Sequence, residues 1–167
     1  KMRLVQQHLD SVIGDSCPNV SIDIASRTVN LDAPLAFEGG KAQIKEEDHF
    51  KMSQVGKIIR TLYDTLQMFE WPMIHVQFDG HVQPTGDDEK CEMISYFRAA
   101  EVVDKCRKAG VPKKYMHAFG YGGTRTLGDK NLNRRVEIHL IKDDAGVEKS
   151  MHAARALWST ITNTYLH

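Results

Sequence analysis

The chain of 167 residues lacks several features that would place it in a functional class at once. No apolar run approaches the ~18–20 residues that a membrane-spanning helix needs, so we expect no membrane span. Lys plus Arg and Asp plus Glu are both 22, which gives a formal net charge of zero. A neutral chain offers no broad electrostatic attraction to polyanions. We therefore expect no nucleic-acid partner.

Motifs of metal binding and catalysis are also missing. The three cysteines, Cys17, Cys91 and Cys106, include no C-x-x-C spacing, and the eight histidines include no His-x-x-x-His pair. No nucleophile-elbow sequence is present. The glycines at 120–123 do not open a predicted helix, which argues against a phosphate site. We predict a protein that is not an enzyme and needs no metal or cofactor.

The ends and the thiols bear on the compartment. An odd number of cysteines without obvious pairing favours a reducing or organellar compartment slightly over a bacterial periplasm or envelope. The chain begins at Lys1 without a signal-like segment. From this we expect a fragment or a processed form of a longer protein.

What is present is an ordinary globular composition with clear periodicity, 41% hydrophobic and 26% charged. Helical spacing predicts a leading helix within residues 1–13, and alternating apolar residues predict a strand pair over 20–31. Strands and helices then alternate, which predicts a two-layer α/β sandwich with some parallel pairing. The expected elements are a helix over 52–66, a strand over 74–78, a helix over 93–103, and strands over 116–119 and 136–140.

The last segment carries one apolar stripe at helical spacing. Its members are Val147, Met151, Ala154, Trp158, Ile161 and Tyr165, which are separated by four or three residues. We expect a helix that packs back on its own sheet. The alternative is a helix that docks on a partner protein through residues such as Trp158 and Tyr165. The predicted division is a leading helix and linker over 1–19, a main domain over 20–142 and a C-terminal amphipathic helix over 143–167.

Four motifs follow one another within residues 80–138: GHVQ, ISYFRAAEV, FGYG and NRRVEI. In order and spacing they resemble the OmpA-like domain, the C-terminal module of outer-membrane anchors and MotB-type motor proteins. The resemblance covers about residues 28–141. It implies the βαβαββ sandwich of that family, here with the added helix at the C-terminus.

The resemblance also implies a ligand pocket. That family grips the diaminopimelate residue of peptidoglycan with an acidic side chain and an arginine. Here the arginine is Arg98, but Gln83 takes the place of the acid, and Cys91 stands where asparagine is common. Thr85 and Ser95 remain compatible with the pattern. The pocket positions are therefore Gln83, Thr85, Cys91, Ser95 and Arg98, and we describe the site as degenerate.

Three arginines admit more than one role. Arg98 suits a carboxylate, but it also lies near Asp87, Asp88 and Glu101 in the sequence. For Arg134 and Arg135, before the final strand, we favour fold maintenance over a place in the pocket wall.

The altered pocket, the unpaired thiols and the terminal helix favour one function. We expect a non-catalytic binding domain that has become a protein-interaction or scaffold module, with protein partners in a larger assembly. The alternative is a cell-envelope anchor that binds the peptidoglycan peptide stem with weakened affinity.

Overall fold

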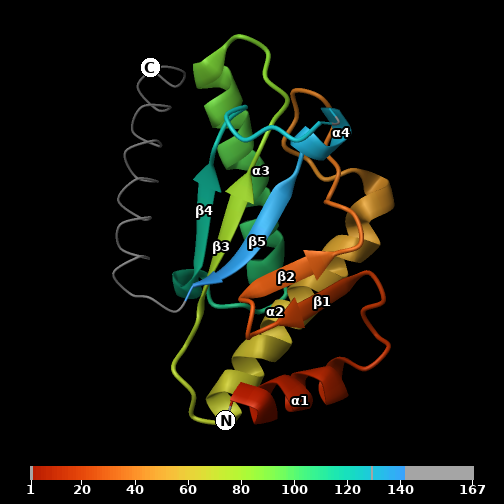
Figure 1. Cartoon of the computed structure of the whole chain (residues 1–167), viewed down its shortest axis with the longest axis vertical. Helices are drawn as coiled ribbons and strands as arrows, with labels where there is room; N and C mark the ends of the chain where they lie inside the picture. Colours follow the sequence, from red (N-terminus) through yellow and green to blue (C-terminus); the bar gives the residue numbers. More distant parts are fainter. Residues whose placement is uncertain (1, 129, 142–167) are drawn as a thin grey trace.

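The computed structural model describes residues 2–128 and 130–141, and its strands and helices follow the predicted order (Figure 1). Two short 3-10 turns, Glu46–Asp48 and Lys113–Tyr115, and the short helix α4 were not predicted. The elements are α1 (Met2–Ile13), β1 (Val20–Asp23), β2 (Thr28–Leu31), α2 (His49–Met68), β3 (His75–Gly80), α3 (Asp88–Lys108), β4 (Met116–Gly120), α4 (Lys130–Asn133) and β5 (Val136–Ile141).

One mixed sheet forms one layer of the domain. Its strand order is β1-β2-β5-β3-β4, and β3 pairs with β4 in parallel while the other pairings are antiparallel. Helix α3 connects the parallel pair and packs on both of its strands, and α2 packs on β1 and α3. The predicted two-layer α/β sandwich and the parallel pairing are confirmed.

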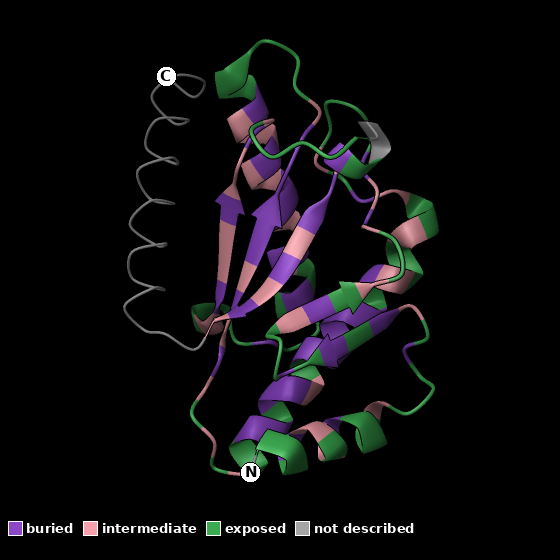
Figure 2. Ribbon diagram, viewed as in Figure 1, coloured by how far each residue is buried: buried purple, intermediate pink, exposed green. Residues whose placement is uncertain are grey.

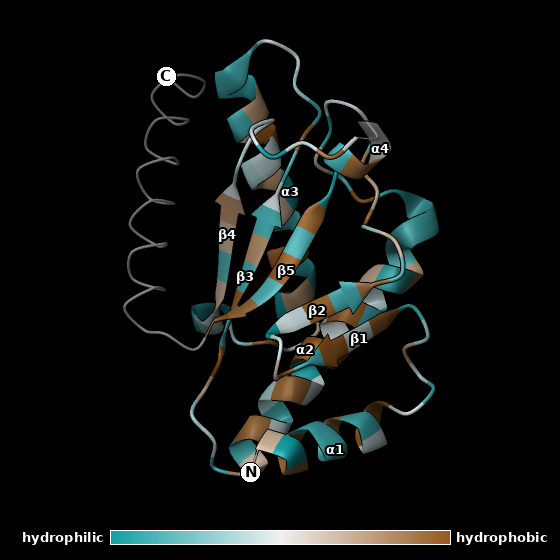
Figure 3. Cartoon of the chain, in the orientation of Figure 1, coloured by the Kyte–Doolittle hydropathy of each residue, from teal (hydrophilic) through white to brown (hydrophobic). Residues whose placement is uncertain are grey.

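The core lies between the sheet and these two helices. Val76 and Phe78 of β3 are fully buried, and their partners on β5 are Leu140 and Ile138. Alternate residues of a strand point to opposite faces, and β1 and β5 accordingly alternate between buried and more exposed residues. Figure 2 shows this alternation as buried and partly exposed bands, and Figure 3 shows it as hydrophobic and hydrophilic bands.

Helix α1 adds to this core. Val5 and Leu9, four residues apart on one face, are buried, and α1 packs on α2. The Gln6 side chain accepts from the Ile24 N–H at 2.9 Å and donates to the Ile22 carbonyl at 3.0 Å. The leading helix is therefore tied to the first hairpin by both apolar and polar contacts. The boundaries of the predicted three-part division, at 19/20 and 142/143, stay predictions.

Two glycines let α3 lie directly on the sheet. Gly80 and Gly120 are paired at the ends of β3 and β4. A Cβ on Gly80 would lie 1.8 Å from the carbonyl oxygen of Ser95, and one on Gly120 would lie 2.7 Å from Ser95 Oγ. Only glycine allows so close an approach of two backbones. The contact fixes α3, and with it the residues that α3 contributes to the candidate site.

The predicted C-terminal helix, with Met151, Trp158, Ile161 and Tyr165, falls outside the described residues, and both of its possible roles stay predictions. In the part of the chain that the structure describes, no helix combines the length and the apolar character needed to cross a membrane.

Candidate ligand-binding site

Four of the five predicted pocket residues line one cavity of about 290 Å³. Gln83 and Thr85 come from the loop after β3, and Cys91 and Arg98 come from α3. Gly39 and Gly40, in the loop before α2, form another part of the wall. In Figure 1 this is the upper end of the sheet, where that loop lies beside α4. The sequence prediction therefore brought together residues that are close in space.

Ser95 is the exception among the five. It is fully buried, its Oγ donates to the Glu92 carbonyl at 2.8 Å, and the same atom accepts from the Gly122 N–H at 2.9 Å. The first bond lies within α3 and the second ties α3 to the loop after β4, so Ser95 supports the fold and does not line the cavity. The structure thus does not place Ser95 with the other four, and a ligand role for it stays a prediction.

Arg98 is a buried anchor for the loop before α2. Its Nε and Nη2 donate to the carbonyls of Lys41 and Glu38 at 2.8 and 2.9 Å, and Nη1 donates to the His81 carbonyl at 3.1 Å. The guanidinium carbon lies 5.2 Å from the centre of the Phe37 ring, within cation–π range. Burial, with a smaller effect of nearby Arg134, lowers the pKa of Arg98 to about 10.

This differs from the pairing with nearby acids that the sequence offered as one role for Arg98, and its carboxylate-binding role stays a prediction. Among the described residues, its hydrogen bonds go to main-chain carbonyls and not to Asp87, Asp88 or Glu101. Three of its five N–H groups are used in this way, so it reaches the cavity with a reduced capacity for a ligand.

The structure separates the two arginines before β5. Arg135 is buried, donates to the Leu132 and Arg125 carbonyls, and forms an ion pair with Glu137 at 3.0 Å. It serves the fold, as we favoured for both. Arg134 instead lines the cavity, and its guanidinium lies against Gly39, where a Cβ would be 3.5 Å from Nη2. This position suits the alternative place in the pocket wall, and the role of Arg134 stays a prediction.

Asn133 is a residue that sequence reasoning missed. It is buried, its Oδ1 accepts from the Leu127 N–H, and its Nδ2 donates to Gln83 Oε1. The side-chain amide of Gln83 is thus oriented by a hydrogen bond from a buried residue 50 positions away in the sequence. Asn133 opens the NRRVEI motif, but nothing in that motif indicates a contact with Gln83.

The charge around the cavity is mostly positive. Lys90, Arg98 and Arg134 line it, and Asp87 is the one carboxylate among the lining residues. Asp87 is the N-cap of α3, since its Oδ1 accepts from the Lys90 N–H at 3.1 Å. Thr85 Oγ1 lies 3.4 Å from Cys91 Sγ, so the thiol has a polar neighbour in the same wall. The arrangement favours an anionic group in the cavity.

A second polar cluster lies behind the loop that carries Gln83. His81 is 1% exposed, neither ring nitrogen has a hydrogen-bond partner among the described residues, and its ring stacks on Tyr121 at 5.5 Å. Burial, together with the positive charge of Arg135, lowers the pKa of His81 to about 4, against the pull of Glu137. Burial raises the pKa of nearby Asp79.

This histidine predicts a loss of stability in mild acid. The pKa of His81 in the folded protein lies below its ordinary value of 6.5, so the unfolded state binds a proton more readily than the folded state. The free energy of unfolding is therefore highest above pH 6.5 and decreases as the pH falls toward 4. The full loss is about 3 kcal/mol at about 1.4 kcal/mol per pKa unit. Urea unfolding of the wild type and of His81→Phe between pH 7 and pH 4 measures it. The variant keeps the ring stack and removes the titration, so parallel pH curves would contradict the assignment.

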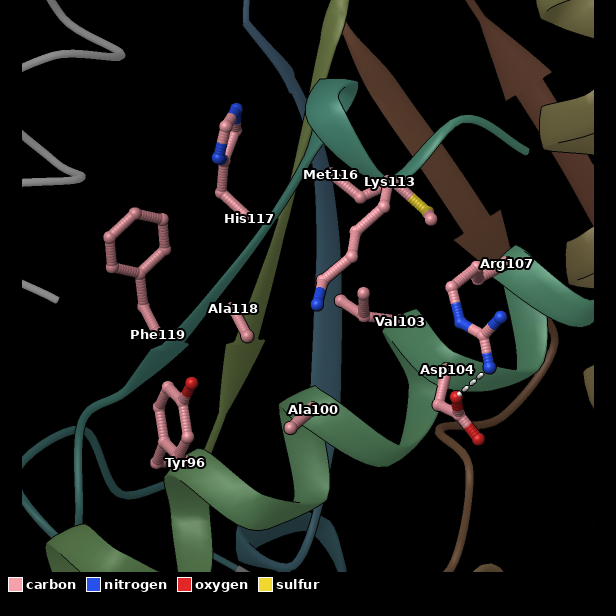
Figure 4. A pocket seen from close by; sticks show the side chains of 10 residues that line it. All are labelled: Tyr96, Ala100, Val103, Asp104, Arg107, Lys113, Met116, His117, Ala118 and Phe119. Atoms are coloured by element: carbon pink, nitrogen blue, oxygen red, sulfur yellow. Dashed lines mark hydrogen bonds and ion pairs between the residues drawn. The ribbon is translucent and has the colours of Figure 1, made fainter. Parts of the chain in front are cut away.

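Another hollow, of about 310 Å³, opens between α3 and the edge strand β4 (Figure 4). Ala100, Val103 and Met116 contribute apolar side chains, and Arg107 is paired with Asp104 at 2.9 Å. None of the predicted site residues lines it.

Among the described residues, no three His, Cys, Asp or Glu side chains gather where they would hold a metal ion.

The fold is that of bacterial envelope domains. The peptidoglycan-associated lipoprotein of Burkholderia pseudomallei is 17% identical, with a TM-score of 0.54 over 65% of this chain and 89% of that one. An outer membrane protein of Borrelia burgdorferi is 21% identical, with a TM-score of 0.56 over 74% and 97%. The periplasmic domain of Helicobacter pylori MotB is 20% identical, with a TM-score of 0.54 over 92% and 93%. The predicted resemblance to OmpA-like and MotB domains is confirmed at the level of the fold.

A curated relative agrees with these structures. Outer membrane porin F of Pseudomonas fluorescens is 25% identical over an alignment of 118 residues that covers 67% of this chain. The chain spans about a third of the length of that relative. No protein-family model matches the chain.

The relatives give no support to the slight preference for a reducing compartment, because they are named as outer-membrane, lipoprotein or periplasmic proteins. The cysteines themselves explain why that argument was weak. All three are free and buried, with 6%, 4% and 0% exposure for Cys17, Cys91 and Cys106. A buried thiol is sheltered from oxidants, so its presence says little about the compartment.

Proposed function

We propose that the chain is a non-catalytic domain of the bacterial cell envelope that binds the peptide stem of peptidoglycan with weakened affinity. The observation that carries this proposal is the cavity in which Gln83, Arg98 and Arg134 meet. It lies where the OmpA-like pattern implies the ligand. The name of the Burkholderia lipoprotein, which associates it with peptidoglycan, supports the same ligand class.

The weakening follows from the exchange of an acid for Gln83. A carboxylate accepts charge-assisted hydrogen bonds from the ammonium group of diaminopimelate, each worth about 1.5–3 kcal/mol. A neutral amide loses the charge part of this energy. By the usual conversion the loss is about ten- to a hundredfold in affinity. Arg98 and Arg134 remain available for the carboxylate of the same residue.

A second candidate is the protein-interaction or scaffold role that the sequence favours. One observation still supports it: the cavity carries three cations and a neutral amide, which also suits the C-terminal carboxylate of a partner protein. The envelope relatives favour peptidoglycan over this role, so we place it second.

Sedimentation with purified peptidoglycan sacculi tests the proposal. We expect the wild type to co-sediment and Arg134→Gln to lose at least about tenfold in affinity, because a charged contact to the ligand is gone. Arg107→Gln is the matched control, since it removes the same charge from an exposed ion pair on α3 and should bind as the wild type does. Equal sedimentation of the wild type and Arg134→Gln would count against peptidoglycan binding at this cavity.

A further inference from the structure

The hydrogen bonds behind the pocket determine which end of the Gln83 amide faces the ligand. The Leu127 main-chain N–H donates to Asn133 Oδ1. Because a main-chain N–H can only donate, the Asn133 oxygen must be at that contact, and Nδ2 is the atom directed at Gln83. Nδ2 donates to Gln83 Oε1. One backbone group therefore orients both side-chain amides.

The consequence is a donor in the pocket wall at position 83. Gln83 lines the cavity, whereas Asn133, which holds its oxygen, is buried and is not part of that wall. Among residues 2–128 and 130–141, Gln83 Nε2 makes no hydrogen bond. Its two N–H groups are left for a ligand. Where the OmpA-like pattern presents an acceptor, this chain presents a donor.

The rest of the wall carries the same preference. Arg98 keeps two N–H groups beyond those that bind carbonyls, and Arg134 and Lys90 add two further positive charges. The single carboxylate, Asp87, is engaged as the N-cap of α3. An ammonium group in this cavity would meet mostly donors and cations, with Asp87 as its one acidic neighbour, while a carboxylate would meet mostly favourable partners.

We propose that this cavity selects a carboxylate and gains nothing from an ammonium group beside it, and that Asn133 sets this preference by holding Gln83. Asn133 is thus a specificity-determining residue that acts through its neighbour. The inference rests on the proposed function, since it names the part of the peptide stem that the cavity holds. The preference for a carboxylate can be measured with small soluble ligands, without the sacculus.

Calorimetric titration of three synthetic stem tripeptides tests the preference. Their third residue is amidated at its main-chain carboxyl group, and its side chain ends in a carboxylate and an ammonium group (diaminopimelate), a carboxylate alone (2-aminopimelate) or an ammonium group alone (lysine). The wild type should bind the first two within about threefold and the lysine peptide at least about tenfold more weakly. Binding of the diaminopimelate peptide tenfold or more above the aminopimelate peptide would overturn the proposal.

Two substitutions test the role of Asn133. Asn133→Asp keeps an acceptor for the Leu127 N–H and turns the second atom into an acceptor, so Gln83 must flip and present Oε1 to the cavity. Its preference for diaminopimelate over aminopimelate should rise at least about fivefold. The double variant Asn133→Asp with Gln83→Leu has the new negative charge at position 133 but no amide at position 83, and its preference for diaminopimelate should disappear. A preference that persists in the double variant would overturn the role of the amide.

Glutarate, a simple dicarboxylate, separates this inference from the proposed function. If no tripeptide binds, the proposed function fails, yet glutarate should still shift the NMR signals of the Lys90 and Cys91 amides. Those shifts should vanish in Arg134→Gln and persist in Arg107→Gln. If neither glutarate nor the aminopimelate peptide shifts these signals, the carboxylate preference is wrong.

Discussion

Replacement of Arg98 by alanine should lower the free energy of unfolding by about 3 kcal/mol, because three carbonyls lose a charged donor. The carbonyls of Glu38 and Lys41 belong to the loop before α2, so this loop should lose its attachment to α3. Arg98→Lys should retain only part of the stability, since one ammonium group cannot reproduce a planar fork that reaches three acceptors. Urea unfolding gives the stabilities, and amide hydrogen exchange at residues 38–41 reports the loop.

The matched control for this prediction is Arg107→Ala, on the same helix. Its side chain is 49% exposed and pairs with Asp104, and such surface pairs contribute less than about 1 kcal/mol. If Arg98→Ala cost no more than the control, the anchoring role of Arg98 would be wrong. Because the variant weakens the fold as well as the cavity, Arg134 is the better position for binding experiments.

Gly80→Ala should destabilise the protein by about 3 kcal/mol or more, the upper end of overpacking costs. The added Cβ would lie 1.8 Å from the Ser95 carbonyl oxygen and 2.7 Å from its carbon. Both atoms are backbone, so no side-chain rotation relieves the clash, and α3 must move away from β3. The midpoint of urea unfolding measures this loss.

Gly128→Ala provides the comparison. A Cβ there meets nothing within 4 Å, and the backbone is not in the left-handed region. Its stability should stay within about 0.5 kcal/mol of the wild type. Equal unfolding midpoints for the two alanine variants would show that α3 does not rest on Gly80 as described.

The fold was predictable because its apolar residues keep a regular period. Val76 and Phe78 alternate as a strand buried on one face must, and α2 repeats its apolar residues every three or four positions. The close approach of α3 to Gly80 was not predictable. A glycine at the end of a strand is equally typical of a turn, and only the spatial position of Ser95 distinguishes the two roles.

The site was predictable only as a set of positions. The sequence spacing of the motifs predicted that Gln83, Thr85, Cys91 and Arg98 lie close together, and they line one cavity. The spacing gave no information about hydrogen bonds to main-chain carbonyls. The Arg98 partners Glu38, Lys41 and His81 and the Ser95 partner Gly122 lie in loops of irregular backbone, so these contacts could not be predicted. The Asn133–Gln83 contact joins residues 50 positions apart, and no local pattern encodes it.

The decisive experiment for an OmpA-like fold with an altered contact at position 83 compares three proteins in the sacculus sedimentation assay. We expect affinity to fall in the order Gln83→Asp, wild type, Arg134→Gln, with about tenfold or more between neighbours. Gln83→Asp restores the acceptor for the diaminopimelate ammonium group. If Gln83→Asp bound no better than the wild type, the exchange at position 83 would not be what weakens binding.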